Sequence, residues 1–237
     1  MKKIFFFMGL IGLFGLLGQS SFSFAQDRTL VSMSEIQKIE KEIDETAFKI
    51  LNSNGIERRM VFTFDVARTE DAKTSHRNRQ ITLYRGLYTR LSSNEELAAI
   101  LAHEISHAED SYKGIFKGYF SKLSTIYPPN QKKFEYKADK RAVDYLVNAG
   151  YNPVSLIVVL NKVAPQTRYD WYSSHPLTTR RTATIYEYIY RKYPEFLVNN
   201  KYKDNVFYQN FLLTSKENRK KFKENYDNNF KKSPKYL

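Results

Sequence analysis

Two histidines and a glutamate lie close together near the middle of the chain, at His103, Glu104 and His107. Residues four positions apart share one face of an α-helix, so both imidazoles can bind the same metal ion. Glu104 follows the first histidine directly and can reach a water molecule on that metal without binding the metal itself. The H-E-x-x-H pattern therefore predicts a zinc site in which the glutamate acts as general base.

A catalytic zinc ion usually has three protein ligands, so a third ligand is expected later in the chain. Glu135 and Asp139 are the candidates, because they lie one turn apart on one face of a predicted helix. Glu135 completes a site of two histidines and one glutamate, and Asp139 can accept a hydrogen bond from a ligand imidazole. The alternative is that both carboxylates pair with neighbouring lysines and arginines on a solvated helix face.

The predicted elements around these residues are mostly helices. A capping signal, Ser92 with Glu95 or Ser93 with Glu96, begins the histidine helix, which runs to about Asp110. Apolar spacing predicts further helices, and two short aromatic or β-branched runs predict strands. The predicted helices are Ser34–Leu51, Gln131–Ala149, Pro153–Val163 and Leu177–Tyr193; the strands are Met60–Ala67 and Gln80–Tyr84; Arg68–Arg79 and Ala164–Pro176 are loops, and 111–130 is a loop or loosely helical lid.

The amino-terminal residues have the three parts of a secretory signal peptide. Lys2 and Lys3 precede an apolar run that ends near Leu17, and Ser23 and Ala25 are small residues at the expected cleavage positions. The apolar run is shorter than the roughly 20 residues that span a bilayer. We expect residues 1–25 to be removed during export, with an uncleaved membrane anchor as the alternative.

The chain is basic, with 38 lysines and arginines against 25 acidic residues, a formal charge of +13 and no cysteine. Without disulfides, its stability depends on core packing and on metal binding. For an exported protein, the positive charge favours an anionic membrane surface or acidic envelope polymers over nucleic acid, which we do not expect as a partner. The alternative is an ordinary solvated surface.

Three ordered segments resemble the zinc metallopeptidases related to HtpX and the CAAX prenyl proteases. The first runs from Gln80 to Glu109 and contains a strand, a Gly-Leu turn and the histidine helix. The second, Glu135–Ala142, matches an E-x-x-x-A-D-x-x-A pattern, and the third is Ser174-His175-Pro176 followed by Arg181. The resemblance implies an α+β fold: a mainly helical gluzincin-type core with a small antiparallel sheet beside the histidine helix.

The resemblance also implies a role for each site residue. One Zn²⁺ per chain is bound by His103, His107 and Glu135, and His175 donates to the oxyanion or transiently fills the fourth zinc position. Arg181 orients Asp139 or the loop that carries His175. The alternative for His175 is a loop or capping histidine without a catalytic role, and the alternative for Arg181 is a surface arginine. Many relatives carry an N-A-F-A-like edge segment where this chain has Ser75–Arg79.

We therefore expect residues 26–193 to form a zinc metallopeptidase domain and residues 194–237 a basic helical tail. The nearest resemblance is to exported, soluble periplasmic proteases that are connected with outer-membrane assembly. The expected function is a periplasmic endopeptidase that acts on unfolded or misassembled envelope proteins, with membrane association or secretion as alternatives. Competing functions are a zinc-binding, chaperone-like or latent protease module with a covered site, and a basic surface-binding protein in which the motif is accidental.

Overall fold

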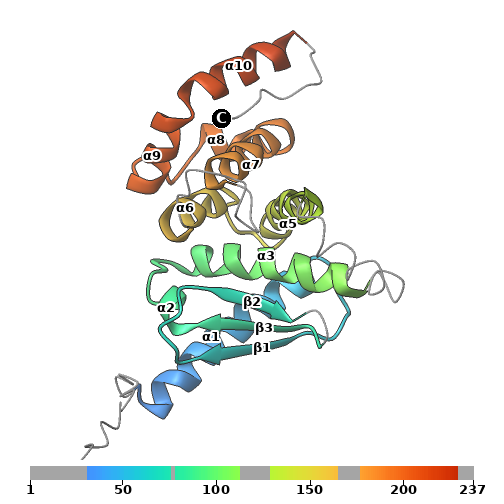
Figure 1. Cartoon of the computed structure of the whole chain (residues 1–237), viewed down its shortest axis with the longest axis vertical. Coiled ribbons are helices and arrows are strands. Elements are labelled where there is room, and N and C mark those ends of the chain that lie inside the picture. The colour runs from blue at the N-terminus through green and yellow to red at the C-terminus, as the bar shows by residue number, and fades with distance from the viewer. Residues whose placement is uncertain (1–30, 76–77, 113–128, 165–176, 229–237) are drawn as a thin grey trace, which may run out of the picture.

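The computed structural model describes residues 31–75, 78–112, 129–164 and 177–228. These residues form a layered stack with a small sheet at one end (Figure 1). Helix α3 (Asn94–Tyr112) lies along the sheet, and helices α5 (Pro129–Asn148), α6 (Val154–Val163) and α7 (Thr178–Lys192) lie on its other side. The expected α+β fold with a predominance of helix is confirmed.

The sheet has three strands in the order β1-β3-β2. Strand β3 (Gln80–Tyr84) pairs parallel with β1 (Val61–Asp65) and antiparallel with β2 (Ala72–Ser75). The expectation of an antiparallel sheet is therefore wrong for β1, and the predicted loop Arg68–Arg79 contains a strand. Strand β2 lacks the apolar alternation of a half-buried strand, and its extended backbone depends on pairing with β3.

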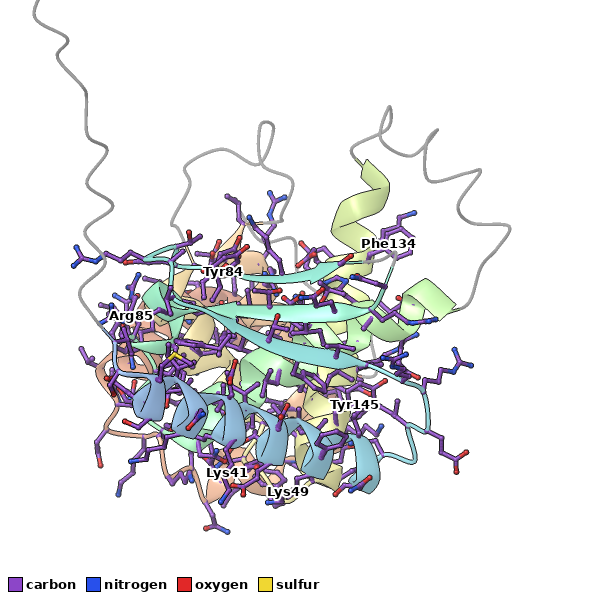
Figure 2. The ribbon with its side chains drawn as sticks, turned by 90° about the horizontal axis from the view of Figure 1, so that it is seen from below. Lys41, Lys49, Tyr84, Arg85, Phe134 and Tyr145 are labelled. Carbon is purple, nitrogen blue, oxygen red and sulfur yellow. The ribbon has the colours of Figure 1, made fainter. Side chains whose placement is uncertain are left out.

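Helix α1 (Met33–Ser53) packs against β1 and α3. It begins at Ser32, whose side chain accepts a hydrogen bond from the Glu35 N–H, as is usual for a helix N-cap. The buried face of α1 carries apolar residues at helical spacing, whereas Lys41 and Lys49 project from the side away from the sheet (Figure 2). This pattern confirms the predicted amphipathic helix.

Helix α3 is the central element of the stack, because it contacts α1, β2, β3, α5 and α6. The Glu96 N–H bonds to the Ser93 hydroxyl at 3.3 Å, and the Glu96 carboxylate accepts from the Ser92 N–H at 2.9 Å. Of the two predicted caps, the structure thus has the one formed by Ser93 and Glu96. From Glu96 to Ala108, every side chain is buried except Glu104 and His107.

The helices after α3 confirm the predicted boundaries to within a few residues. Helix α5 ends in a Schellman motif at Gly150, whose φ of 74° suits glycine. The Gly150 N–H bonds to the Val147 carbonyl, and the Tyr151 N–H to the Leu146 carbonyl. This turn leads directly into the apolar helix α6. No helix in the described residues is long and apolar enough to cross a membrane.

The tail forms helices α8 (Glu195–Val198), α9 (Val206–Thr214) and α10 (Lys216–Asp227), which agrees with the predicted helical tail. Phe211 and Phe222 are buried with the rest of the core. The predicted boundary between peptidase domain and tail at residue 193 stays a prediction.

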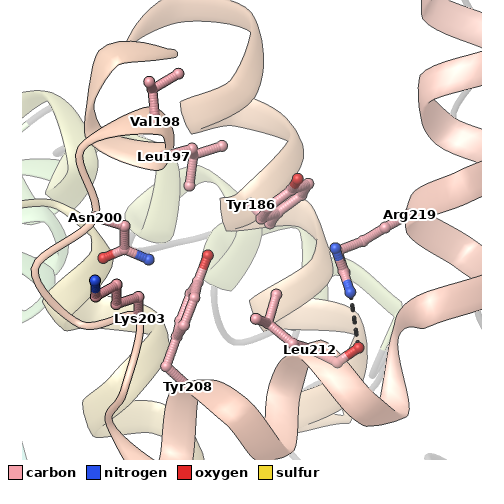
Figure 3. A pocket seen from close by; sticks show the side chains of 8 residues that line it. All are labelled: Tyr186, Leu197, Val198, Asn200, Lys203, Tyr208, Leu212 and Arg219. Carbon is pink, nitrogen blue, oxygen red and sulfur yellow. Dashed lines mark hydrogen bonds between the residues drawn. The ribbon is translucent and has the colours of Figure 1, made fainter.

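A cavity of about 250 Å³ (Figure 3) lies between α7 and the tail, apart from α3 and α5. It is lined by Tyr186, Leu197, Val198, Asn200, Lys203, Tyr208, Leu212 and Arg219.

The turn that leads from β3 into the short helix α2 (Arg85–Tyr88) requires glycine at position 86. The Gly86 N–H bonds to the Ala67 carbonyl at 3.2 Å, which holds the segment between β1 and β2 against this turn. A Cβ on Gly86 would lie 2.2 Å from the Arg68 carbonyl oxygen. The contact is with backbone, so relief requires the segment that leads into β2 to move.

We predict that Gly86→Ala lowers the free energy of unfolding by about 3 kcal/mol, because it overpacks this backbone contact. Gly55→Ala is the control, since Gly55 has a φ of 59° but nothing within 4 Å of a Cβ; its cost is the left-handed backbone penalty of about 1 kcal/mol. Urea denaturation measures both. Equal losses in the two variants would contradict the close approach at Gly86.

Candidate metal centre

Helix α3 brings His103 and His107 together on successive turns. Their Nε2 atoms lie 3.1 Å apart, and the two rings meet edge to face at an angle of 84°. His103 is 9% exposed, whereas His107 and Glu104 are the partly exposed residues of this otherwise buried stretch. The central helix therefore reaches solvent at the turn that carries the motif.

Helix α5 packs against α3 (Figure 1). It carries Glu135, which lies beside both imidazoles. His107 Nε2 lies 3.3 Å from Glu135 Oε1, and His103 Nε2 lies 3.5 Å from Glu135 Oε2. In a zinc tetrahedron with bonds of about 2.0–2.1 Å, adjacent ligand atoms are separated by about 3.3 Å. The three side chains thus have the mutual spacing that one tetrahedral ion requires.

The donor chemistry also fits a divalent metal. Imidazole nitrogen and carboxylate oxygen are the usual ligands of catalytic zinc. These three residues form the one group of histidines and carboxylates in the described part of the chain whose ligand atoms lie within 4.8 Å of one another. The sequence-predicted ligands are therefore together in space and could bind one metal ion.

Asp139 lies one turn after Glu135 and is completely buried. His103 Nδ1 donates to Asp139 Oδ1 at 3.0 Å, which turns the opposite ring nitrogen toward Glu135 and His107. Burial alone would raise the pKa of the Asp139 carboxyl. Arg181 and His103 lower this pKa by more than burial raises it, so it lies below the usual range. Asp139 is therefore an anion that fixes both the orientation and the tautomer of a candidate ligand.

Arg181 reaches the same carboxylate from helix α7. Its Nε donates to Asp139 Oδ2 at 2.9 Å and its Nη2 to Asp139 Oδ1 at 2.6 Å, in the two-pronged arrangement typical of arginine and carboxylate. Arg181 is 7% exposed, so the surface-arginine alternative is wrong. The expected contact of Arg181 with Asp139 is therefore present, whereas the loop that carries His175 lies outside the described residues.

The carboxylates of this cluster attract positive charge to His103. Burial lowers the pKa of His103, but its hydrogen bonds to Asp139 and Glu135 raise that pKa to about 9. A metal ion competes with protons for the same nitrogen, so a site that attracts a proton also attracts a metal ion. Lys137 and Arg141 pair with Asp110 rather than with Glu135 or Asp139.

One contact at the site was not predicted from the sequence. Thr74 on β2 donates a hydrogen bond from its hydroxyl to Glu104 Oε2 at 2.6 Å. The threonine lies in the segment predicted as a loop, and its Ala-Lys-Thr-Ser context gives no strand signal. His175 lies outside the described residues, as does the predicted signal peptide, residues 1–25.

Comparison with known families agrees with this geometry. The model of peptidase family M48 matches residues 34–126 and 112–189. The chain belongs to peptidase family M48. Members of this family are metallopeptidases, so the chain is a metal-dependent peptide hydrolase, and the resemblance to zinc metallopeptidases expected from its three sequence segments is confirmed. No curated protein matches the chain.

We predict that Arg181→Met destabilises this M48 peptidase by about 3–5 kcal/mol, because it leaves the buried Asp139 carboxylate without its main counter-charge. Arg191→Met is the matched control on the same helix. Arg191 is exposed and stacks on Phe222 and Tyr226, so its loss costs about 1 kcal/mol or less. Urea unfolding of both variants measures these costs. Similar losses of unfolding free energy in the two variants would show that the buried ion pair stabilises the fold no more than a surface contact does.

Proposed function

We propose that this protein is an exported zinc endopeptidase that hydrolyses unfolded or misassembled cell-envelope proteins. The observation that carries the proposal is the tetrahedral spacing of His103, His107 and Glu135 beside the partly exposed Glu104. A carboxylate next to a metal site is the arrangement that water-activating peptidases need. Membership of family M48 supports the same reaction class.

In this proposal, His103, His107 and Glu135 would hold a zinc ion, which when bound would polarise the scissile carbonyl and lower the pKa of water. As the oxygen of the attacking water bonds to the carbonyl carbon, Glu104 accepts a proton from that water. The glutamate then delivers this proton to the amide nitrogen as the carbon–nitrogen bond breaks. Asp139 holds His103 in place throughout. His175, as the family resemblance implies, is proposed to donate to the oxyanion.

The position of β2 supports an extended polypeptide as substrate. Among the described strands, β2 pairs with β3 on one edge and with no strand on the other. Such an edge can add a substrate segment as a further strand through backbone hydrogen bonds. The edge lies beside Glu104, because Thr74 of β2 contacts that residue. A segment that binds in this way must be unfolded, which favours damaged or unassembled proteins.

We predict that Glu104→Gln lowers the rate of cleavage of unfolded casein by the zinc-loaded protein at least about 100-fold, because the proton acceptor is lost. Zinc content should remain one ion per chain. Glu109→Gln is the control on the same helix, since an amide oxygen can still accept the hydrogen bond from the Tyr145 hydroxyl. Peptide release over time and metal analysis measure the two effects.

Two other outcomes of this experiment would contradict the proposal. Cleavage at an unchanged rate by Glu104→Gln would remove the glutamate from the mechanism. No cleavage by the unaltered protein, with zinc still bound, would favour the zinc-binding, chaperone-like or latent module instead. The Glu109→Gln control shows whether loss of a carboxylate from α3 lowers the rate by itself.

We further propose a periplasmic location, with attraction to anionic membranes or outer-membrane assembly proteins. The signal-like amino terminus and the positive formal charge of +13 support this. Expressed from its own amino terminus in a Gram-negative host, the protein should occur in the periplasmic extract with the mass of residues 26–237. Any membrane-bound share should be released by salt. Full-length protein that resists salt extraction would instead show a retained anchor.

A further inference from the structure

Glu104 receives a side-chain hydrogen bond from a different layer of the fold. It lies on α3, and among the described residues Thr74 of strand β2 supplies the side-chain hydrogen bond to its carboxylate. The oxygen–oxygen distance of 2.6 Å is typical of a hydroxyl that donates to an ionised acceptor. The same hydroxyl lies 3.2 Å from the Glu104 carbonyl oxygen, so the shorter, charge-assisted contact takes its single proton.

Strand register directs the Thr74 side chain toward the helix. Thr74 pairs with Ile81, which is 1% exposed, and side chains of paired residues project from the same face of a sheet. Lys73 pairs with Thr82 on the opposite face. Thr74 is half-buried and Lys73 exposed, in agreement with this alternation. The hydroxyl is thus held in place by a paired backbone.

The contact leaves the glutamate free to act. A carboxylate has two oxygens and about four acceptor sites, so a bond at Oε2 leaves Oε1 available to take a proton. A glutamate side chain also rotates about three torsions, and a partly exposed one has several positions open to it. A fixed donor restricts these positions before substrate arrives, and small errors in the placement of reacting groups lower rates strongly.

We propose that Thr74 is a positioning residue, which holds the Glu104 carboxylate at the metal centre from the edge strand along which substrate binds. The inference rests on the proposed function, because it requires Glu104 to be the general base. Glu104, the proposed base, is then oriented by a residue of the sheet as well as by its own helix. Substrate binding along β2 and placement of the base then depend on the same strand.

The test compares Thr74→Val, which keeps the shape but removes the hydroxyl, with Thr74→Ser, which keeps the hydroxyl. In the zinc-loaded protein, we expect Thr74→Val to lower kcat for casein cleavage about 10-fold or more, with KM changed by less than about 2-fold. Thr74→Ser should recover most of the rate. Zinc content should be unchanged in both variants.

Thr82→Val is the matched control, because it removes a hydroxyl from the same sheet on the face away from Glu104. Thr82 bonds to Thr63 at 2.9 Å, so the control also loses one hydrogen bond. Its kcat should stay within about 2-fold of the unaltered protein. Urea unfolding shows whether the two valine variants are equally stable, and Thr74→Ala repeats the loss of the hydroxyl if Thr74→Val does not fold.

A crystal structure of Thr74→Val provides a readout besides activity. We expect the Glu104 side chain to have alternative rotamers or higher mobility than in the unaltered protein, with the metal ligands in place. An unchanged kcat in Thr74→Val, beside an inactive Glu104→Gln, would overturn the positioning role and leave the proposed function intact. So would a raised KM with unchanged kcat, lost zinc, or failure of Thr74→Ser to restore the rate. An active Glu104→Gln would overturn the proposed function itself.

Discussion

The buried ion pair between Arg181 and Asp139 connects the three helices that build the candidate metal centre. Arg181 comes from α7, Asp139 from α5, and the same carboxylate accepts a hydrogen bond from His103 on α3. Unpaired charges in a protein interior are costly, so these groups constrain one another and the helices that carry them. Arg181 also approaches Glu135 at 3.4 Å, which places one arginine beside two carboxylates. A metal ligand must be a neutral imidazole, so with His103 neutral Arg181 balances only one of the two carboxylate charges and a bound cation can balance the other.

Besides the buried ion pair, the central position of α3 constrains the site. A helix with neighbours on several sides is apolar around most of its circumference, as this one is from Leu97 to Ala108. Its chemistry is therefore confined to the turn where Glu104 and His107 reach solvent. Strand β2 borders that turn and contributes Thr74. Helices, ion pair and edge strand thus converge on one small region, which explains how a mainly hydrophobic stack holds a polar reaction site.

Much of this centre is predictable from local sequence. The spacing of His103 and His107 is a helical property, and Glu135 with Asp139 repeats it on another helix. The partner of Arg181 is not predictable in this way, because the contact joins residues that are 42 positions apart and depends on how α7 packs. Non-local pairing also explains why two predictions about the sheet were wrong. The parallel pairing of β1 with β3 and the polar strand β2 have no periodic signal of their own.

We propose that His103, His107 and Glu135 together bind one catalytic zinc ion. A crystal structure of the zinc-loaded protein, with diffraction measured at the zinc absorption edge, tests it most directly. We expect one anomalous peak per chain, about 2.0–2.2 Å from the Nε2 atoms of His103 and His107 and from a Glu135 oxygen. A peak held by other residues, or an active protein without metal at these three side chains, would contradict it.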